Sequence, residues 1–440
     1  MFAGFLPFLA RAFFTRPILL VVLVATALPL RAQPFELILK GGHVIDPRNN
    51  IDGVRDVAVA NGRIAAVATN LTPTPGTQVI DARGMFVTPG LIDLHVHLFA
   101  TTGVKGAWAG DNSVLPDGFS FRTGVTTMVD AGSSGWRNFE TFRHTVIDRA
   151  QTRVLAMINI AGLGMMTNAA EQVAAEFQPA EVVALARKHK DVVVGVKTAH
   201  YELPDWNSVD RALEAGKAAG IPIMVDFGYF RPERPYWQLV TEKLGRDDIS
   251  THCYRASVAW MDENNRVHGY LHRARERGVK FDVGHGAGSL VFRNAVPAIK
   301  AGFYPDSIST DLHTLSMNIA MLDMPTTMSK FLVMGMPLKD VILRSTWNPA
   351  QMIRRPELGH LSVGAGADIA VLRVDTGEFH YIDSKSGRMR GTQRITCELT
   401  LRDGKVVWDW NGRAGTDYQR LPPDYGLREG IDVVVPPPKS

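Results

Sequence analysis

Short apolar runs alternate with helix-like stretches in the middle of the chain, from residue 89 to residue 352. Each apolar run has the length and near-continuous hydrophobicity of a strand buried on both faces. Helix-like stretches such as Pro179–Lys190, Ser208–Gly220 and Tyr270–Gly278 separate the runs. This alternation predicts an α/β fold, a (β/α)8 TIM-type barrel over residues 89–352. The eight predicted strands are Gly90–Leu98, Gly124–Asp130, Arg153–Ile160, Asp191–Lys197, Ile221–Phe227, Asp248–Cys253, Val279–His285 and Ser307–Leu312.

The sequences on both sides of this region are typical of short strands and turns. Residues 33–88 and 353–415 contain strand-like runs, and Asn61-Gly62 and Asp403-Gly404 are typical of tight hairpin turns. We expect these stretches to form one small discontinuous β-sandwich domain from both chain ends. Residues 416–440 are rich in proline. This C-terminal arm is either a disordered tail or an extended arm over a neighbouring subunit of a homo-oligomer.

The first 32 residues have the composition of a secretory signal peptide. Arg11 and Arg16 precede the apolar run Ile18–Leu30, which is too short to span a bilayer comfortably. Small residues allow cleavage after Ala27 or after Ala32. We therefore expect an exported protein, periplasmic or secreted, with no stable membrane association after processing. An uncleaved N-terminal anchor is the alternative.

Charge and cysteine content narrow the classes of partner. The net charge is +4, and three of the arginines that contribute to it lie in the first 32 residues, which hold no acidic residue. The nearly neutral remainder gives no argument for a nucleic acid or an acidic surface partner. Cys253 and Cys397 are the two cysteines, and their expected placement in different domains argues against a disulfide even in an exported protein.

Two histidines at the end of the first barrel strand are the first sign of chemistry. His95 and His97 are two residues apart, so they point to the same face of the strand Gly90–Leu98. Two imidazoles on one face can bind one divalent cation. The alternative is a core strand that happens to carry histidines, and the other strands have to decide between the two.

Polar side chains with metal-binding atoms also end the later strands. Catalytic groups of such barrels lie at the carboxyl ends of the strands. Buried charges are costly unless they are paired or bound to metal, so packing alone does not explain this set. The side chains concerned are Lys197, Asp226, His252, His285 and Asp311.

Several motifs give the chain a resemblance to a known family. They are Gly90-Leu-Ile-Asp-Leu-His-Val-His97, Gly195-Val-Lys197, Thr251-His-Cys253, Phe281-Asp-Val-Gly-His-Gly286, Pro305-Asp-Ser-Ile-Ser-Thr-Asp-Leu312 and Asn348-Pro-Ala350 with Gly366-Ala-Asp-Ile369. The chain resembles the amidohydrolase superfamily, and within it the dihydroorotase-like branch of predicted amidohydrolases and deacetylases. The resemblance extends over nearly the whole mature chain.

The resemblance implies a binuclear centre with two divalent metal ions, Zn²⁺ being expected. His95, His97 and Asp311 would bind the first ion. Lys197, N6-carboxylated by CO₂, would bridge to the second ion, which His252 and a group from the fifth strand would complete. Asp311 would also be the catalytic proton acceptor, and His285 would support the ligands or replace one.

One residue departs from the family pattern. The family has a histidine at the end of the fifth strand, where this chain has Asp226. Aspartate is a competent zinc ligand, so Asp226 can take the place of that histidine. Alternatively, Asp226 pairs with Arg231 or Arg255, the second ion is held weakly, and His285 becomes a ligand.

The implied reaction is hydrolysis of an amide or ester bond by a hydroxide that bridges the metal ions. A deacetylase or deacylase of N-acyl amino acids or acylated hydroxy acids would fit, with Arg255 and His200 near this small-molecule substrate. Arg255 would suit a substrate carboxylate. The alternatives are a cyclic amidase of the dihydroorotase type, a mononuclear deaminase, and a non-catalytic scaffold on the same fold.

Overall fold

The computed structural model describes residues 35–99, 112–167 and 169–436, together with Met1 and Gly4. The predicted signal peptide, residues 1–32, lies outside the described residues except for those two positions. Residues 34–440 form one compact unit. Among the described residues, every helix is too short or too polar to cross a membrane.

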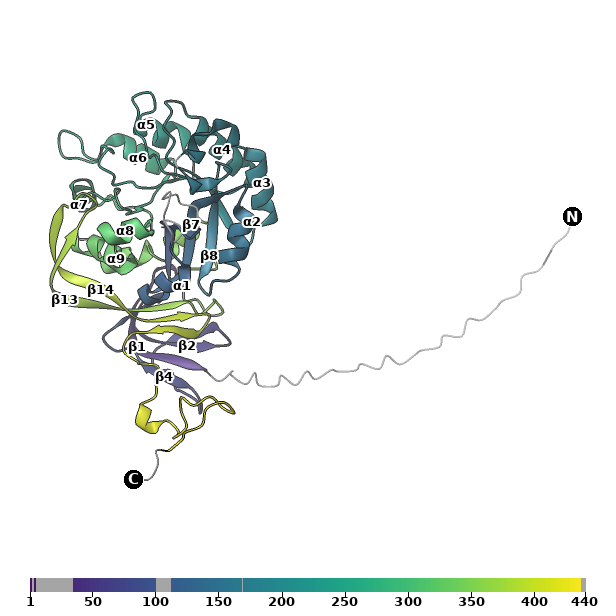
Figure 1. Ribbon diagram of the computed structural model, residues 1–440, viewed down its shortest axis with the longest axis vertical. Helices are drawn as coiled ribbons and strands as arrows, with labels where there is room; N and C mark the ends of the chain where they lie inside the picture. Colours follow the sequence, from purple (N-terminus) through teal and green to yellow (C-terminus); the bar gives the residue numbers. More distant parts are fainter. Residues whose placement is uncertain (2–3, 5–34, 100–111, 168, 437–440) are drawn as a thin grey trace. The chain divides into compact units, whose positions relative to one another are not determined.

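A curled sheet of seven parallel strands lies at the centre of the fold (Figure 1). The strands are adjacent in chain order, and each overlaps one of the predicted strands. They are β6 (Leu91–Val96), β7 (Val125–Gly135), β8 (Arg153–Asn159), β9 (Val193–Thr198), β10 (Ile223–Val225), β11 (Ile249–Ser250) and β12 (Lys280–Phe281).

The eighth predicted strand, Ser307–Leu312, is not a regular strand. It forms isolated parallel bridges with both edges of the sheet, from Leu312 to Val96 and from Ser307 to Asp282. The Asp93 carboxylate accepts hydrogen bonds from the backbone N–H of Thr310 (3.0 Å) and from its hydroxyl (2.5 Å). A buried side chain thus does part of the work of the missing backbone ladder, and burial raises the pKa of Asp93 to about 7 despite these hydrogen bonds.

Helices follow most of the strands and cover the sheet. The helix α3 (Pro179–Lys188) packs against β8 and β9, and α4 (Asn207–Ala219) packs against β9 and β10. Both have apolar faces whose valine and alanine side chains are buried. The others are α1 (Pro116–Phe119), α2 (Phe139–Phe142), α5 (Tyr236–Gln238), α6 (Gly269–Glu276), α7 (Phe292–Lys300), α8 (Thr314–Ile319), α9 (Met324–Val333), α10 (Leu338–Leu343) and α11 (Trp347–Met352).

A second sheet combines strands from both ends of the chain, in the order β15-β14-β13-β5-β1-β2-β3, with β4 beside β1. The two ends meet where β13 pairs antiparallel with β5. Asn61-Gly62 and Asp403-Gly404 both have positive φ angles and form the predicted hairpin turns. The strands are β1 (Leu37–Asp46), β2 (Ile51–Ala60), β3 (Arg63–Ala68), β4 (Gln78–Asp81), β5 (Phe86–Pro89), β13 (Ile369–Ile382), β14 (Arg388–Arg402) and β15 (Lys405–Asp409).

The C-terminal arm is largely exposed over its described residues, which end at residue 436. It contains the short 3-10 helix Tyr418–Arg420, and Ile431 and Val433 expose most of their surface to solvent. Cys253 and Cys397, in contrast, are buried and free.

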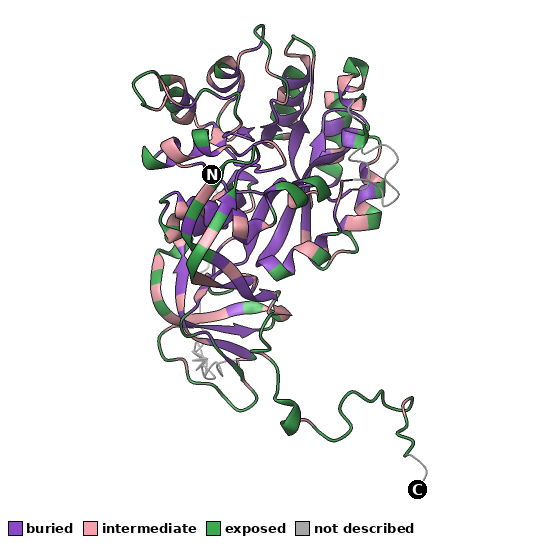
Figure 2. Cartoon of the chain, turned by 60° about the vertical axis from the view of Figure 1, so that its left-hand side comes forward, coloured by how far each residue is buried: buried purple, intermediate pink, exposed green. Residues whose placement is uncertain are grey.

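The parallel sheet is buried on both faces, as its continuous apolar strands predict (Figure 2). One face packs in the largest hydrophobic cluster, to which Val96 and Val196 belong. Side chains such as Leu94 and Met224 form a separate cluster with residues of α11. The carboxyl ends of the strands are thereby held in fixed relative positions.

We predict that Leu94→Ala lowers the free energy of unfolding by about 2–5 kcal/mol, because it leaves a cavity under the first strand. Leu94 is fully buried, whereas Leu115 is 75% exposed. The control Leu115→Ala should change stability by no more than about 0.5 kcal/mol. Urea unfolding of both variants measures the difference, and similar losses in the two would contradict this picture of the core.

Candidate active site

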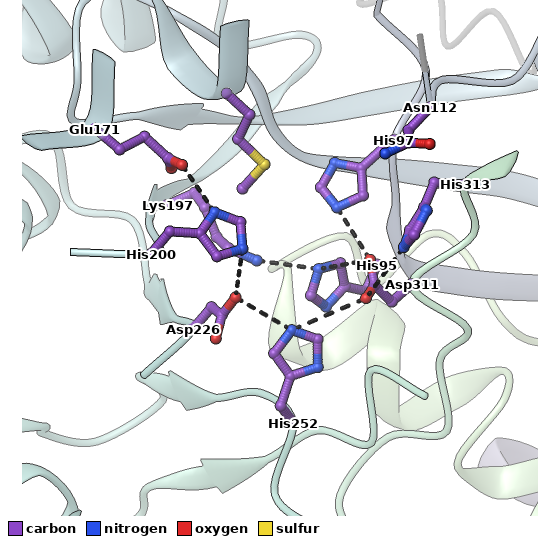
Figure 3. Close-up of a pocket in the computed structure, with 11 residues that line it drawn as sticks. His95, His97, Asn112, Glu171, Lys197, His200, Asp226, His252, Asp311 and His313 are labelled. Atoms are coloured by element: carbon purple, nitrogen blue, oxygen red, sulfur yellow. Dashed lines mark hydrogen bonds and ion pairs between the residues drawn. The ribbon is translucent and has the colours of Figure 1, made fainter. Parts of the chain in front are cut away.

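The carboxyl ends of the parallel strands open into a pocket of about 270 Å³ (Figure 3). The pocket brings together seven of the side chains that the sequence singled out. His97 and Asn112, which precede and follow the undescribed residues 100–111, both line it. Among the described residues, its lining consists of His95, His97, Asn112, Met165, Glu171, Lys197, His200, Asp226, His252, Asp311 and His313.

Histidines surround the Asp311 carboxylate on one side of the pocket. Asp311 Oδ1 lies 3.0 Å from His97 Nε2 and 3.6 Å from His95 Nε2. His252 Nε2 lies 4.0 Å from Asp311 Oδ2. One potential ligand atom each from His95, His252 and Asp311 lies within 4.8 Å of the other two. Imidazole nitrogen and carboxylate oxygen are donors that Zn²⁺ binds, so this group has the chemistry of a metal site.

Hydrogen bonds behind the pocket orient the His95 ring. Thr251 donates its hydroxyl hydrogen to Asp282 Oδ2 (2.7 Å), so His95 Nδ1–H is the donor to Thr251 Oγ1 (2.9 Å). His95 Nε2 is then left with its lone pair toward the pocket. Burial, and after it the charge of Lys197, lower the pKa of His95 to about 3. The ring is therefore neutral, which is the form that binds metal.

Lys197, at the end of β9, is fully buried. Its Nζ lies 3.0 Å from His95 Nε2 and 3.5 Å from Met224 Sδ. No salt bridge joins Lys197 to a carboxylate of the described residues. Burial lowers the pKa of Lys197, although the nearby charges of Asp226 and Asp311 oppose that shift. Its Nζ faces the pocket beside metal-binding side chains, so the position of Lys197 fits that of the expected carbamate.

Asp226, at the end of β10, points into the same pocket (Figure 3). Its Oδ2 lies 3.3 Å from His252 Nε2 and 3.3 Å from His200 Nε2. Its Oδ1 lies 3.3 Å from an Arg255 nitrogen, but this buried oxygen has no hydrogen-bond partner among the described residues. Burial alone would raise the pKa of Asp226, but the charges of His252 and Arg255 hold it well below its usual value.

The Asp226 environment combines both sequence expectations. The carboxylate pairs with Arg255, as one alternative expected, and it also faces the pocket, as the metal-ligand alternative expected. Arg255 already pairs with Oδ1, so the oxygen that remains for a metal ion is Oδ2, which faces two imidazoles. Carboxylate oxygen and imidazole nitrogen are both zinc donors. The residues present therefore fit a divalent metal ion on this side of the pocket as well.

Glu171 and His313 are pocket residues that the sequence analysis missed. Glu171 lies in the 3-10 turn Ala170–Gln172 and accepts a hydrogen bond from His200 Nδ1 (2.8 Å). Its position depends on the conformation of the loop after β8, for which the sequence gives no spacing signal. His313 Nε2 lies 3.9 Å from Asp311 Oδ2. The Asp-x-His spacing of Asp311 and His313 repeats that of His95 and His97 and could have been recognised.

His285 and Arg255 lie outside the lining of the pocket. His285 Nε2 lies 2.6 Å from Lys330 Nζ of α9, and His285 Nδ1 lies 2.9 Å from the Gly286 carbonyl oxygen. The ring is thus turned toward α9 and is absent from the pocket lining. Arg255 contacts Asp226, the carbonyl oxygen of Gly228 (3.3 Å) and Ser289 Oγ (3.1 Å). The Arg255–Asp226 pair is one of the alternatives that the sequence left open, and the substrate contact expected of Arg255 stays a prediction.

Three of the pocket residues have left-handed backbone conformations. The φ angles are +52° for His200, +56° for His252 and +52° for Asp311. Such conformations cost non-glycine residues about 1–3 kcal/mol each and are concentrated at functional sites. The fold therefore stabilises a strained arrangement that turns these side chains toward one another.

Comparisons with known proteins agree with this geometry. The amidohydrolase family model matches residues 242–407. A deacetylase of Agrobacterium fabrum is 35% identical over 337 residues, which cover 74% of this chain and 79% of the deacetylase.

Two crystal structures have the same fold over most of their length. An adenine deaminase superposes with a TM-score of 0.77 and 26% identity, covering 86% of this chain and 100% of the deaminase. A dihydroorotase superposes with a TM-score of 0.73 and 28% identity, covering 85% of this chain and 99% of the dihydroorotase. With the family match and the extensive identity to a deacetylase, the chain belongs to the amidohydrolase superfamily.

Proposed function

We propose that this protein is a deacetylase or deacylase that hydrolyses an amide or ester bond of a small N-acyl amino acid or acylated hydroxy acid. It would use two divalent metal ions, Zn²⁺ in the simplest case, with N6-carboxylated Lys197 between them. The observation that carries the proposal is the convergence of buried metal-binding side chains on Lys197 in one pocket. These side chains are His95, His97, Asp226, His252 and Asp311.

Asp311 is positioned to accept and return a proton. Burial would raise its pKa, but the neighbouring His95 and His313 hold it well below the usual value, so it is a carboxylate at neutral pH. Divalent ions held by the pocket residues would make a water molecule more acidic and polarise the scissile carbonyl group. Asp311 can take the proton of the attacking water and transfer it to the leaving group.

The pocket favours a compact, polar substrate. Its volume of about 270 Å³ is below the range typical of sites for drug-sized ligands, and charged or polar side chains form most of its lining. An acetyl group on a short amino acid or hydroxy acid fits such dimensions. The 35% identity to a protein named as a deacetylase supports the same class.

A deaminase is the second candidate function. The TM-score of 0.77 over the whole length of an adenine deaminase favours it. A mononuclear deaminase of this superfamily resembles the present site less, because it normally has no bridging lysine, whereas Lys197 lies in the pocket here. The aspartate at the end of the fifth strand departs from both classes.

A substrate panel distinguishes these functions. We expect the Zn²⁺-loaded protein to release acetate from N-acetyl amino acids or acetylated hydroxy acids and no ammonia from adenine. A chelator should abolish the activity, because the metal ions that lower the pKa of the attacking water would be removed. Adding Zn²⁺ back should restore it. Ammonia release from adenine without deacylation, or hydrolysis that survives complete metal removal, would refute the proposal.

We also predict that Lys197→Ala loses bound metal and lowers kcat/KM on the order of 100-fold or more, since several kcal/mol of transition-state stabilisation depend on the metal ions. Short carboxylic acids should partly restore activity by occupying the space of the carbamate. The measurements are metal content by mass spectrometry and kcat/KM with and without propionate.

The matched control for this variant is Lys300→Ala, which removes an exposed lysine at the end of α7. It should leave metal content and turnover unchanged. If Lys197→Ala also keeps its metal and its turnover, Lys197 does not bridge metal ions.

A further inference from the structure

Two imidazole rings face the same carboxylate oxygen on the Asp226 side of the pocket. The Nε2 atoms of His200 and His252 each lie 3.3 Å from Asp226 Oδ2 (Figure 3). His252 comes from the end of β11, where the family pattern places a ligand. His200 comes from the segment after β9, where the family resemblance implies no ligand.

Both rings use their other nitrogen as a hydrogen-bond donor. His252 Nδ1 lies 2.6 Å from the carbonyl oxygen of Gly284, which can only accept. His200 Nδ1 lies 2.8 Å from Glu171 Oε2. Each ring therefore presents its Nε2 to Asp226 Oδ2. Burial opposes a charge on His200, but Glu171 and Asp226 raise its pKa well above the usual value, so without metal its Nε2 proton lies toward Asp226. Two imidazole nitrogens and a carboxylate oxygen are zinc donors once a divalent ion takes the place of that proton.

The backbone around His200 is adapted to this position. The left-handed conformation at His200 (φ +52°) turns its ring back toward β10. Gly228, two residues after Asp226, leaves the space that the ring occupies. A Cβ atom on Gly228 would lie 3.2 Å from His200 Cα and 3.4 Å from His200 Cδ2. Contacts this tight leave little room for any residue other than glycine beside His200.

Glu171 fixes the orientation of the ring. Glu171 is 2% exposed, and its second carboxylate oxygen accepts a hydrogen bond from Asn159 Nδ2 (3.0 Å). The backbone of His200 is held in addition by Gln172, whose Nε2 donates to the His200 carbonyl oxygen (2.8 Å). A carboxylate that holds the Nδ1–H of a histidine is the usual outer partner of a metal-binding imidazole.

We propose that His200 supplies the imidazole ligand of the second metal subsite, beside Asp226 and His252, and that Glu171 is the positioning residue that orients it. His200 thus replaces, from the loop after β9, the histidine that relatives carry at the end of the fifth strand. The side chain of Asp226 is shorter than that of histidine, and His200, from the end of the neighbouring strand β9, supplies the imidazole. This inference rests on the binuclear centre of the proposed function and revises the substrate-binding role expected for His200.

Metal binding by variants of the full-length protein tests the proposal. Zn²⁺ content and competition with a chromophoric chelator are measured for the wild type, His200→Ala, His200→Gln and Glu171→Gln. Both His200 variants should retain one tightly bound ion and lose most of the second. Glu171→Gln should weaken the second ion by about 10–100-fold, as losses of outer partners do. The ligand-field absorption of Co²⁺ in the second site should change in all three.

Matched controls separate metal binding from folding. Glu176→Gln alters a carboxylate of the same loop that pairs with Arg137, and His144→Ala removes an exposed histidine. Both should bind two ions with wild-type affinity. The His200 side chain is 40% exposed, so its variants should unfold at nearly the wild-type temperature.

Two outcomes would overturn the assignment in different ways. If the His200 variants keep both ions at wild-type affinity and only KM rises, His200 binds substrate and the proposal is wrong while the binuclear centre stands. If the wild type itself binds fewer than two ions under saturating Zn²⁺, the binuclear centre fails, and the assignment of His200 fails with it.

Discussion

The cost of burying charge is the constraint on which this structure depends. Ionised Asp226 and Asp311 lie in one pocket with the amine of Lys197, and all three are shielded from solvent. Each ionised group would cost several kcal/mol if it were left alone in such an environment. Arg255 pairs with one oxygen of Asp226, and the other oxygen faces imidazole nitrogens, as the Asp311 carboxylate does. Divalent cations would offset these costs, so the polar arrangement is stable as a binding site rather than as packing.

The surrounding fold supplies the rigidity that such a site requires. Parallel strands buried on both faces fix the backbone positions from which the side chains enter the pocket. Left-handed backbone conformations at His200, His252 and Asp311 turn the segments after the strands toward the pocket. Asp282 connects two walls behind the pocket, because it accepts hydrogen bonds from Thr251, Ser307 and Ser309. These contacts place strain and polar groups where a ligand can compensate for them.

The sequence predicted the parts of this architecture that depend on local pattern. Apolar runs located seven strands of the parallel sheet and the irregular segment Ser307–Leu312. The ends of these runs located the pocket residues His95, His97, Lys197, Asp226, His252 and Asp311. The segment Ser307–Leu312 has backbone hydrogen bonds to both neighbouring strand ends but forms isolated bridges rather than the regular strand expected, and the side chain of Asp93 adds two further hydrogen bonds at Thr310. Loop conformations and side-chain directions could not be predicted from the sequence. The approach of Glu171 to His200, and the turn of His285 toward Lys330, depend on tertiary contacts that no spacing in the sequence records.

Anomalous diffraction at the zinc edge from crystals of the Zn²⁺-loaded protein tests the central claim most directly. The account predicts two peaks in the pocket, about 3.5–4 Å apart as in other two-metal sites. One peak should lie against His95, His97 and Asp311, and the other against Asp226 and His252, with density for a carboxylate on Lys197 Nζ between them. A single peak beside an unmodified Lys197, or no peak in the pocket, would contradict it.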